Sequence, residues 1–265
     1  MILQISTQVL LDTILQRYAD EVARVGNTFK TTKETAEAVQ SICKWLTNSN
    51  KPGLCLYGTT GTGKTALSRA LFRFLREYPR EVRARYDSES ARIYEESRKR
   101  IAEIYPAWNS WLGHDERLAW MAENGEKSAQ IQRINAEMDE ELTRAGRPLV
   151  EALNGLPRPA QFYTAQEVAN MATRDDWQSI LPGLLSEQIL FVDDLGVEPL
   201  RVFSRPCEVR PIEELIYRIY DERKPFVITT NLSLSDISKN YGERVADRLR
   251  ELCAFIAFKS KSFRG

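Results

Sequence analysis

The sequence lacks a net charge, a pair of neighbouring cysteines and a long apolar run. Its 37 lysine and arginine residues equal its 37 aspartate and glutamate residues. The overall charge therefore gives no argument for a nucleic acid or a membrane surface as a partner. Any basic binding surface must be local, and we expect no membrane partner.

The few cysteines limit the class of protein further. Cys43, Cys55, Cys207 and Cys253 are widely separated, and two of them lie in apolar runs typical of buried strands. This distribution predicts reduced thiols in a cytoplasmic protein rather than a disulfide framework. A zinc site is disfavoured too, because no two cysteines are close and His114 is the only histidine.

The first segment, residues 1–27, has apolar residues at helical intervals that are interrupted by Gln, Asp and Arg. This pattern predicts an amphipathic helix from about Thr7 to Val25, ended by Gly26-Asn27, and not a signal peptide or a membrane span. The apolar side of the helix can pack on its own domain or on a partner. Packing on its own domain is the simpler expectation.

A glycine-bearing loop follows the short apolar strand Leu54 to Tyr57 and opens a helix. The loop has the complete G-x-x-x-x-G-K-T pattern in its strand-loop-helix setting, which disfavours the alternative of a polar surface turn. Glycines let successive backbone N–H groups turn toward phosphates, and the helix N-terminus adds a favourable dipole. The expected nucleotide-binding residues are Gly58, Thr59, Thr60, Gly61, Thr62, Gly63, Lys64 and Thr65.

Two of these side chains have further expected roles. Lys64 is expected beside the β- and γ-phosphates of a bound nucleotide. The hydroxyl of Thr65 is the expected Mg²⁺ ligand, because Mg²⁺ prefers oxygen ligands.

About eighty residues after this helix differ in character, because residues 80–159 are dense in charges of both signs. Apolar residues recur there at helical spacing, which predicts a helical hairpin or small bundle inserted into the main domain. Interleaved aromatic and basic residues could bind single-stranded nucleic acid by stacking. The equally frequent carboxylates favour a packing role for the tryptophans of this segment, Trp108, Trp111 and Trp120.

Two acids end an unbroken apolar run at residues 188–192, which is typical of a strand buried on both faces. Beside a phosphate-binding loop, Asp193 is expected to order the Mg²⁺ water shell, and Asp194 to polarise the attacking water. Alternatively, the two carboxylates cap the following turn.

Asn231 ends the next apolar strand, Pro225 to Thr230. If this strand lies beside the acid-bearing one, the Asn231 amide lies near the γ-phosphate and can orient the water. Alternatively, Asn231 only caps the turn that follows.

Strands and helices alternate along the main domain, at residues 28–79 and 160–265. This alternation predicts an α/β fold of the P-loop NTPase type, a three-layer sandwich whose parallel sheet has helices on both faces. In such folds the ligand binds at the carboxyl ends of the strands, where all of the candidate residues lie.

Four segments in this order, GTTGTGKT, ILFVDDLG, PFVITTN and YGERVADRLRE, resemble the AAA+ ATPases of the bacterial helicase-loader group. The resemblance is to DnaC/DnaI-type loaders and to the related IstB transposition ATPases, over roughly residues 28–78 and 160–264. The first two segments fit many P-loop ATPases. The fourth, followed by a short strand and a basic end, is the more selective signal.

The resemblance implies ATP and Mg²⁺ as cofactors and a role for each candidate residue. Asp193 corresponds to the Mg²⁺-associated acid, Asp194 to the catalytic acid and Asn231 to the polar sensor. Arg244 corresponds to an arginine finger, which acts in trans on the nucleotide of the next subunit. A homo-oligomer, ring or open spiral, is therefore expected when ATP is bound.

The sequence also departs from the wider AAA+ pattern. Asp194 stands where many AAA+ enzymes have glutamate, which implies slow hydrolysis. Little sequence follows Phe258, so we expect no C-terminal helical lid, as in the helicase-loader group. The segment at 80–159 has no counterpart in the group, and one hypothesis is that it docks the partner.

Three functions remain open at this stage. The first is a helicase loader of DNA replication, which couples ATP to oligomerisation, single-stranded DNA binding and delivery of a replicative helicase. The second is an IstB-like ATPase that assists a transposase, and the third is a nucleotide-gated scaffold with little hydrolysis. Arg201 and Arg205 are candidate DNA contacts that equally fit solvated loop charges.

Overall fold

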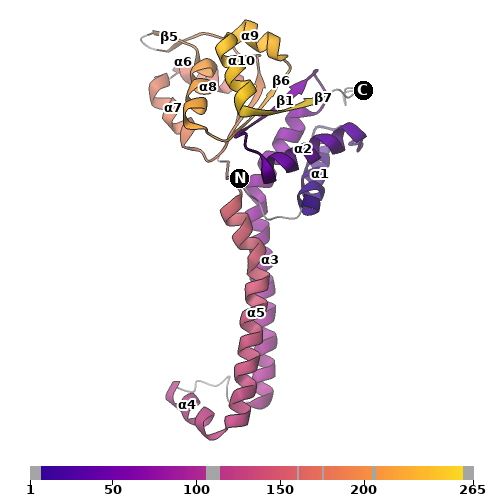
Figure 1. Ribbon diagram of the computed structural model, residues 1–265, viewed down its shortest axis with the longest axis vertical. Coiled ribbons are helices and arrows are strands. Elements are labelled where there is room, and N and C mark those ends of the chain that lie inside the picture. The colour runs from indigo at the N-terminus through magenta and orange to yellow at the C-terminus, as the bar shows by residue number, and fades with distance from the viewer. Residues whose placement is uncertain (1–6, 106–113, 160, 175, 205–206, 259–265) are drawn as a thin grey trace. The chain divides into compact units, whose positions relative to one another are not determined.

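The computed structural model describes residues 7–105, 114–159, 161–174, 176–204 and 207–258. The chain divides into two compact units, which Figure 1 draws. Unit 1 comprises Met1–Tyr78 and Gly155–Gly265, and unit 2 comprises Pro79–Asn154. Residues 155–159, which the charge pattern assigns to the inserted segment, belong to unit 1.

A five-stranded parallel sheet forms the centre of unit 1, with the strand order β2-β3-β6-β1-β7. All of its strands run in one direction, so their carboxyl ends meet at one edge. The predicted α/β class with a parallel sheet is thus confirmed. The strands are β1 (Gly53–Gly58), β2 (Phe162–Thr164), β3 (Leu190–Leu195), β6 (Phe226–Thr230) and β7 (Cys253–Phe258).

Helices cover both faces of this sheet, because alternate side chains of its apolar strands point to opposite faces. In β3, Leu190 and Val192 join the core beneath the helices that follow β2, whereas Phe191 contacts Phe72 on the other face, with 5.4 Å between ring centroids. The helices of the first face are α6 (Ala165–Arg174), α7 (Trp177–Ser186), α8 (Pro211–Glu222), α9 (Leu234–Tyr241) and α10 (Glu243–Leu252).

The opposite layer contains α2 (Lys33–Asn48) and the first part of α3 (Lys64–Ile104). Helix α1 (Thr7–Arg24) packs against α2 and is joined to α3 by ion pairs. Figure 1 shows α1 and α2 on the other side of the sheet from α8 and α10. Arg17 of α1 pairs with Glu77 of α3 at 2.6 Å, and Arg73 of α3 pairs with Glu21 of α1 at 3.0 Å. The first helix therefore packs on its own unit.

Two elements differ from the sequence pattern. The pattern predicts that the loop helix ends near Tyr78-Pro79, but α3 continues to Ile104 with Pro79 inside it. A proline removes one helical hydrogen bond, and the helix-forming residues on both sides outweigh that loss. A short antiparallel hairpin, β4 (Val202–Ser204) and β5 (Cys207–Val209), replaces the expected loop after β3.

The hairpin bears on one of the candidate DNA contacts. Arg201 pairs with Glu208 at 3.5 Å, which partly neutralises its charge. Arg205 lies outside the described residues.

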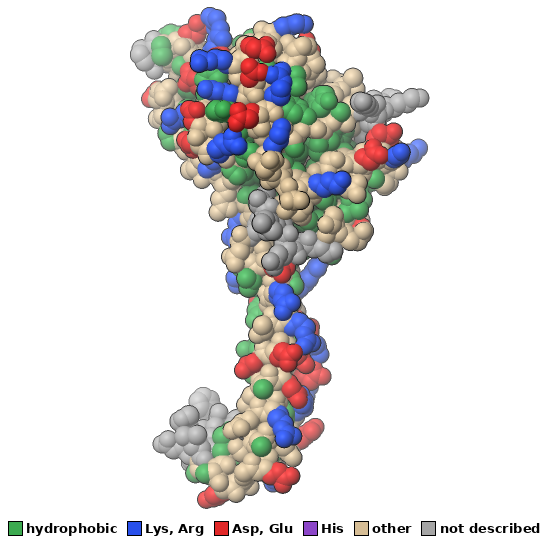
Figure 2. Space-filling view, in the orientation of Figure 1, with side chains coloured by type: hydrophobic (Ala, Val, Ile, Leu, Met, Phe, Trp, Pro, Cys, Tyr) green, Lys and Arg blue, Asp and Glu red, His purple; other side chains and the backbone are tan. Residues whose placement is uncertain are grey.

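Unit 2 contains the rest of α3 together with α4 (His114–Glu123) and α5 (Gly125–Gly155). Ile101, Ile131 and Ile134 form its small core, and Trp120 stacks on Tyr105 with 4.3 Å between ring centroids. Trp120 thus has a packing role; Trp108 and Trp111 lie outside the described residues. Figure 2 shows charges of both signs interspersed along these helices.

Among the described helices of both units, none combines the length and the apolar character that a membrane span requires.

Candidate nucleotide-binding site

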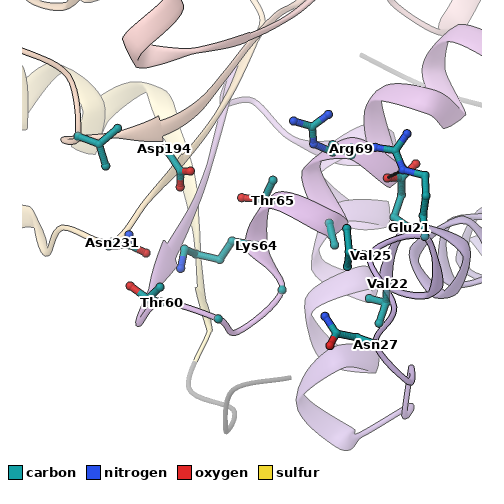
Figure 3. Close-up of a pocket in the computed structure, with 15 residues that line it drawn as sticks. Glu21, Val22, Val25, Asn27, Thr60, Lys64, Thr65, Arg69, Asp194 and Asn231 are labelled. Carbon is teal, nitrogen blue, oxygen red and sulfur yellow. Dashed lines mark ion pairs between the residues drawn. The ribbon is translucent and has the colours of Figure 1, made fainter. Parts of the chain in front are cut away.

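A cavity of about 840 Å³ lies at the carboxyl edge of the sheet in unit 1 (Figure 3). The phosphate-binding loop and the start of α3 form its floor, the tips of β3 and β6 form one wall, and the end of α1 forms the other. The lining residues are Glu21, Val22, Arg24, Val25, Asn27, Thr60, Gly61, Gly63, Lys64, Thr65, Ala66, Arg69, Asp194, Val197 and Asn231.

The loop is held close to the neighbouring strand β7. Gly58 has a φ of +141°, and a Cβ atom at this position would lie 2.2 Å from the carbonyl oxygen of Phe258. Only glycine fits such an approach. The hydroxyl of Thr62, a residue only 1% exposed, donates to the carbonyl of Thr59 at 2.8 Å and braces the loop from inside.

The side chain of Lys64 bends back onto this loop. Its Nζ donates to the carbonyl oxygens of Gly58 at 2.9 Å and Thr59 at 2.7 Å, and the residue is 5% exposed. Burial lowers the pKa of Lys64, and the charges of Asp194 and Asp193 act in the opposite direction. A desolvated ammonium group of this kind interacts strongly with an entering anion.

The two acids lie at a break in the ladder between β3 and β6, where the register shifts between Val192 and Leu195. Asp194 has a φ of 55°, the left-handed region, and lines the cavity. Asp193, 2% exposed, accepts a hydrogen bond from the Thr229 hydroxyl at 2.6 Å. At this irregularity the two consecutive carboxylates differ in their surroundings, because Asp194 lines the cavity whereas Asp193 is buried against Thr229.

The protonation of Asp193 reflects its surroundings. Burial raises the pKa of its carboxyl, and the neighbouring charge of Asp194 acts in the same direction. Hydrogen bonds from Thr229 and Thr65 oppose this shift, as does the charge of Arg69.

Asn231 follows β6, which lies between β3 and β1. In this register Thr230 is opposite both Tyr57 and Leu195, so the next residue lies between the acids and the phosphate-binding loop. Asn231 lines the cavity, and Figure 3 shows its amide beside Lys64. The N-cap of the following helix α9 is Ser233, so Asn231 does not cap that helix.

Arg244 is the candidate that the structure separates from the others. It lies in the first turn of α10, is exposed, and does not line the cavity of its own chain. Its neighbour one turn later, Arg248, lies over the rings of Tyr217 and Tyr220 at 4.1 and 4.8 Å from their centroids.

Sequence reasoning missed several residues of the site. Thr229 is fully buried and bonds to both acids, and its only sequence signal is that two threonines end an apolar strand. Arg69 lines the cavity from α3, with its guanidinium 4.6 Å from the ring centroid of Phe162. The wall formed by the end of α1 has no sequence signal that links it to the loop.

The donor set fits a nucleotide with Mg²⁺. Thr65 and Asp193 offer oxygen atoms of the kind that Mg²⁺ prefers as ligands, and Figure 3 shows the Thr65 hydroxyl on the side that faces Asp194. No cluster of three or more His, Cys, Asp or Glu occurs within the described part of the chain.

Comparison with known proteins gives matches among solved structures. No family model matches the chain, and no curated protein matches it. Among solved structures, the crystal structure of the DnaC helicase loader is 18% identical, with a TM-score of 0.43, over 92% of this chain and 99% of that chain. The crystal structure of DnaI is 13% identical, with a TM-score of 0.44, over 91% of this chain and 89% of that chain.

Proposed function

We propose that this chain is an ATP-binding and hydrolysing protein of the helicase-loader type that acts in DNA replication. The observation that supports the ATPase part is the meeting of a buried lysine, two acids and an amide at one sheet edge. Three adjacent strand ends contribute these residues, which are Lys64, Asp193, Asp194 and Asn231. The charges of both acids act to raise the pKa of Lys64.

Each residue has a role in the proposed reaction. The loop N–H groups and Lys64 hold the β- and γ-phosphates, while Thr65 and Asp193 hold Mg²⁺. When bound, Mg²⁺ neutralises charge that develops on the phosphate oxygens. Asp194 accepts a hydrogen bond from the attacking water, and the Asn231 amide orients that water. Hydrolysis at this site is proposed to be slow, because Asp194 is one methylene shorter than glutamate.

The far end of the cavity suits the rest of the nucleotide. Val22 and Val25 offer apolar surface there, and Asn27 offers its side-chain amide. The backbone N–H of Asn27 donates to the carbonyl oxygen of Val22 at 3.2 Å, which fixes Asn27 to the end of α1. Apolar walls with a few convergent polar groups are typical of small-molecule sites. We assign this end to the base.

Arg244 completes the proposed site from a second copy of the chain. Because it is exposed and lies away from its own cavity, its guanidinium is available to the γ-phosphate of a neighbour. Such a contact in trans stabilises the charge of the transition state and makes hydrolysis depend on assembly. We therefore propose a homo-oligomer in the ATP-bound state.

The loader role itself rests on the sequence motifs. We propose a replicative helicase and single-stranded DNA as the partners, and unit 2 as the element that docks the helicase. The free state of all four cysteines suits the reducing cytoplasm. An alternative, a nucleotide-gated scaffold, is favoured by one observation, the short side chain of Asp194. A second alternative, an IstB-like ATPase assisting a transposase, shares every nucleotide-site residue.

ATP binding and turnover by the full chain test the proposed chemistry, with and without single-stranded DNA. Lys64→Ala is expected to weaken ATP binding at least tenfold, because it removes a charge-assisted contact. Asp194→Asn is expected to keep binding and lose turnover, since asparagine tolerates the left-handed backbone of residue 194 but cannot accept the proton. Unchanged affinity in Lys64→Ala would overturn the site, and tight binding by the unmodified chain without turnover would establish the scaffold.

Capture of partners in the presence of ATP tests the loader role. The unmodified chain is expected to retain a ring helicase, and Lys64→Ala serves as the matched control that cannot bind nucleotide. Recovery of a transposase without a helicase would contradict the loader role and leave the ATPase site intact.

A further inference from the structure

A buried carboxylate, that of Glu198, links two parts of unit 1. Glu198, 6% exposed, follows the turn after β3, and Tyr241, 4% exposed, ends α9. The Tyr241 hydroxyl donates to Oε1 of Glu198, and the backbone N–H of Gly196 donates to Oε2 at 2.8 Å. Within the described residues no cation pairs with Glu198, so neutral donors alone hold a buried carboxylate that is costly to desolvate.

One end of this link is the wall of the nucleotide cavity. Gly196 lies two residues after Asp194, and Val197 lines the cavity. A Cβ atom on Gly196 would lie 2.6 Å from Cδ1 of Leu232, the residue after Asn231. The turn that carries the catalytic acid and the segment that carries the polar sensor are therefore packed directly on each other.

The other end of the link is the corner from which Arg244 projects. Tyr241 is followed by Gly242, which ends α9 and begins α10, with its N–H bonded to Ser238 at 2.9 Å and its carbonyl to Ala246 at 3.3 Å. Arg244 comes two residues later. A side chain that anchors Tyr241 thus anchors the start of the helix that presents Arg244.

We propose that Glu198 and Tyr241 are positioning residues that tie the placement of Arg244 to the state of the chain's own nucleotide cavity. A movement of the Asp194 turn on nucleotide binding is transmitted through Gly196 and Glu198 to Tyr241, and from there to the start of α10. The inference rests on the proposed function, in which Arg244 serves the ATP of the neighbouring subunit. It adds a path by which nucleotide binding in one subunit sets the position of Arg244 at the nucleotide of the neighbouring subunit.

Mixed assemblies separate this role from a purely structural one. A subunit with Asp194→Asn retains Arg244, and a subunit with Arg244→Ala retains Asp194. In a mixture of the two, hydrolysis is recovered only at sites where the first subunit provides Arg244 and the second provides Asp194. Tyr241→Phe, which removes the linking hydroxyl alone, is placed either in the finger-providing subunit or in the acid-providing subunit. We expect about a tenfold loss of the recovered activity in the first case and less than a twofold loss in the second.

Tyr163→Phe is the matched control, because it removes another buried tyrosine hydroxyl that donates to a buried glutamate, Glu187, at 3.2 Å. It is expected to give no difference between the two placements. Glu198→Gln, tested in the same two placements, is expected to reproduce the asymmetry of Tyr241→Phe and keeps the test decisive if that variant folds poorly.

Equal losses in both placements, or no loss, would overturn the link while leaving the shared site standing. A mixture of the two parent subunits that recovers no hydrolysis would instead overturn the shared site on which the inference rests.

Discussion

The hydroxyl of Thr229 donates a hydrogen bond to Oδ1 of Asp193 at 2.6 Å. The hydroxyl oxygen of Thr229 in turn accepts a hydrogen bond from the backbone N–H of Asp194 at 2.9 Å. A single fully buried side chain on β6 thereby holds both acids of β3 at the point where the register between the two strands shifts. The geometry of the acid pair therefore depends on a residue of another strand.

Thr229→Val keeps the shape of this side chain and removes its hydrogen bonds. Leaving the Asp194 N–H and one carboxylate oxygen unpaired is expected to lower the free energy of unfolding by about 1–3 kcal/mol. ATP turnover should fall as well, because the acids lose their support. Urea unfolding and turnover of Thr229→Ser, which keeps the hydroxyl, provide the control, and equal behaviour of the two variants would contradict the assigned role.

The raised pKa of Asp193 predicts a pH dependence of stability in the nucleotide-free protein. A carboxyl whose pKa is higher in the folded state than its ordinary value of 3.8 stabilises the fold fully below that value. This stabilisation is lost as the pH rises through the raised pKa, since the charged form is then buried. Asp193→Asn mimics the neutral form and should not show this loss.

The measurement is urea unfolding of both proteins from about pH 3 to about pH 7. The stability of Asp193→Asn relative to the unmodified chain should increase across this range. A difference that stays constant with pH would show that burial does not raise the pKa of Asp193.

Gly58→Ala tests the close approach of the phosphate-binding loop to β7. Its Cβ would clash with the Phe258 carbonyl oxygen and occupy a strained φ of +141°. We expect a loss of about 2 kcal/mol or more in unfolding free energy. Gly183→Ala in α7 is the control, because its Cβ would meet no atom within 4 Å, and it should stabilise the helix by about 0.5–1 kcal/mol. A stable Gly58→Ala protein would contradict this loop geometry.

The end of α1 is expected to contribute to nucleotide affinity through Glu21, which is 3% exposed and pairs with Arg73. Glu21→Ala should cost roughly 2 kcal/mol in stability, less than a fully buried pair, because Arg73 is partly exposed and keeps Glu77. It should also weaken ATP binding severalfold by loosening the wall formed by Val22 and Asn27. Both quantities can be measured in a nucleotide titration and a urea series.

Glu37→Ala, which removes an exposed pair with Lys33, should change neither quantity measurably. Unchanged nucleotide affinity in Glu21→Ala would show that α1 is not part of the binding site.

Local sequence patterns were sufficient to predict the elements that depend only on residues close together in the chain. The phosphate-binding loop is recognisable because its glycines, Lys64 and Thr65 act within one strand-loop-helix segment. The position of the two acids near the end of a strand was predictable because they follow an apolar run. The continuation of α3 past Pro79 was not, since the helix-forming tendency on both sides of a proline must be weighed against the bond that it removes.

The sequence by itself determined the α/β class, the phosphate-binding loop and the strand ends that carry Asp193, Asp194 and Asn231, because each is specified by spacing within a short segment. The tertiary structure alone decided which strands are neighbours, that Thr229 supports both acids, that α1 forms a wall of the cavity, and that Glu198 meets Tyr241. These relationships join residues distant in the chain, and strand register and packing, which no local spacing encodes, bring them together.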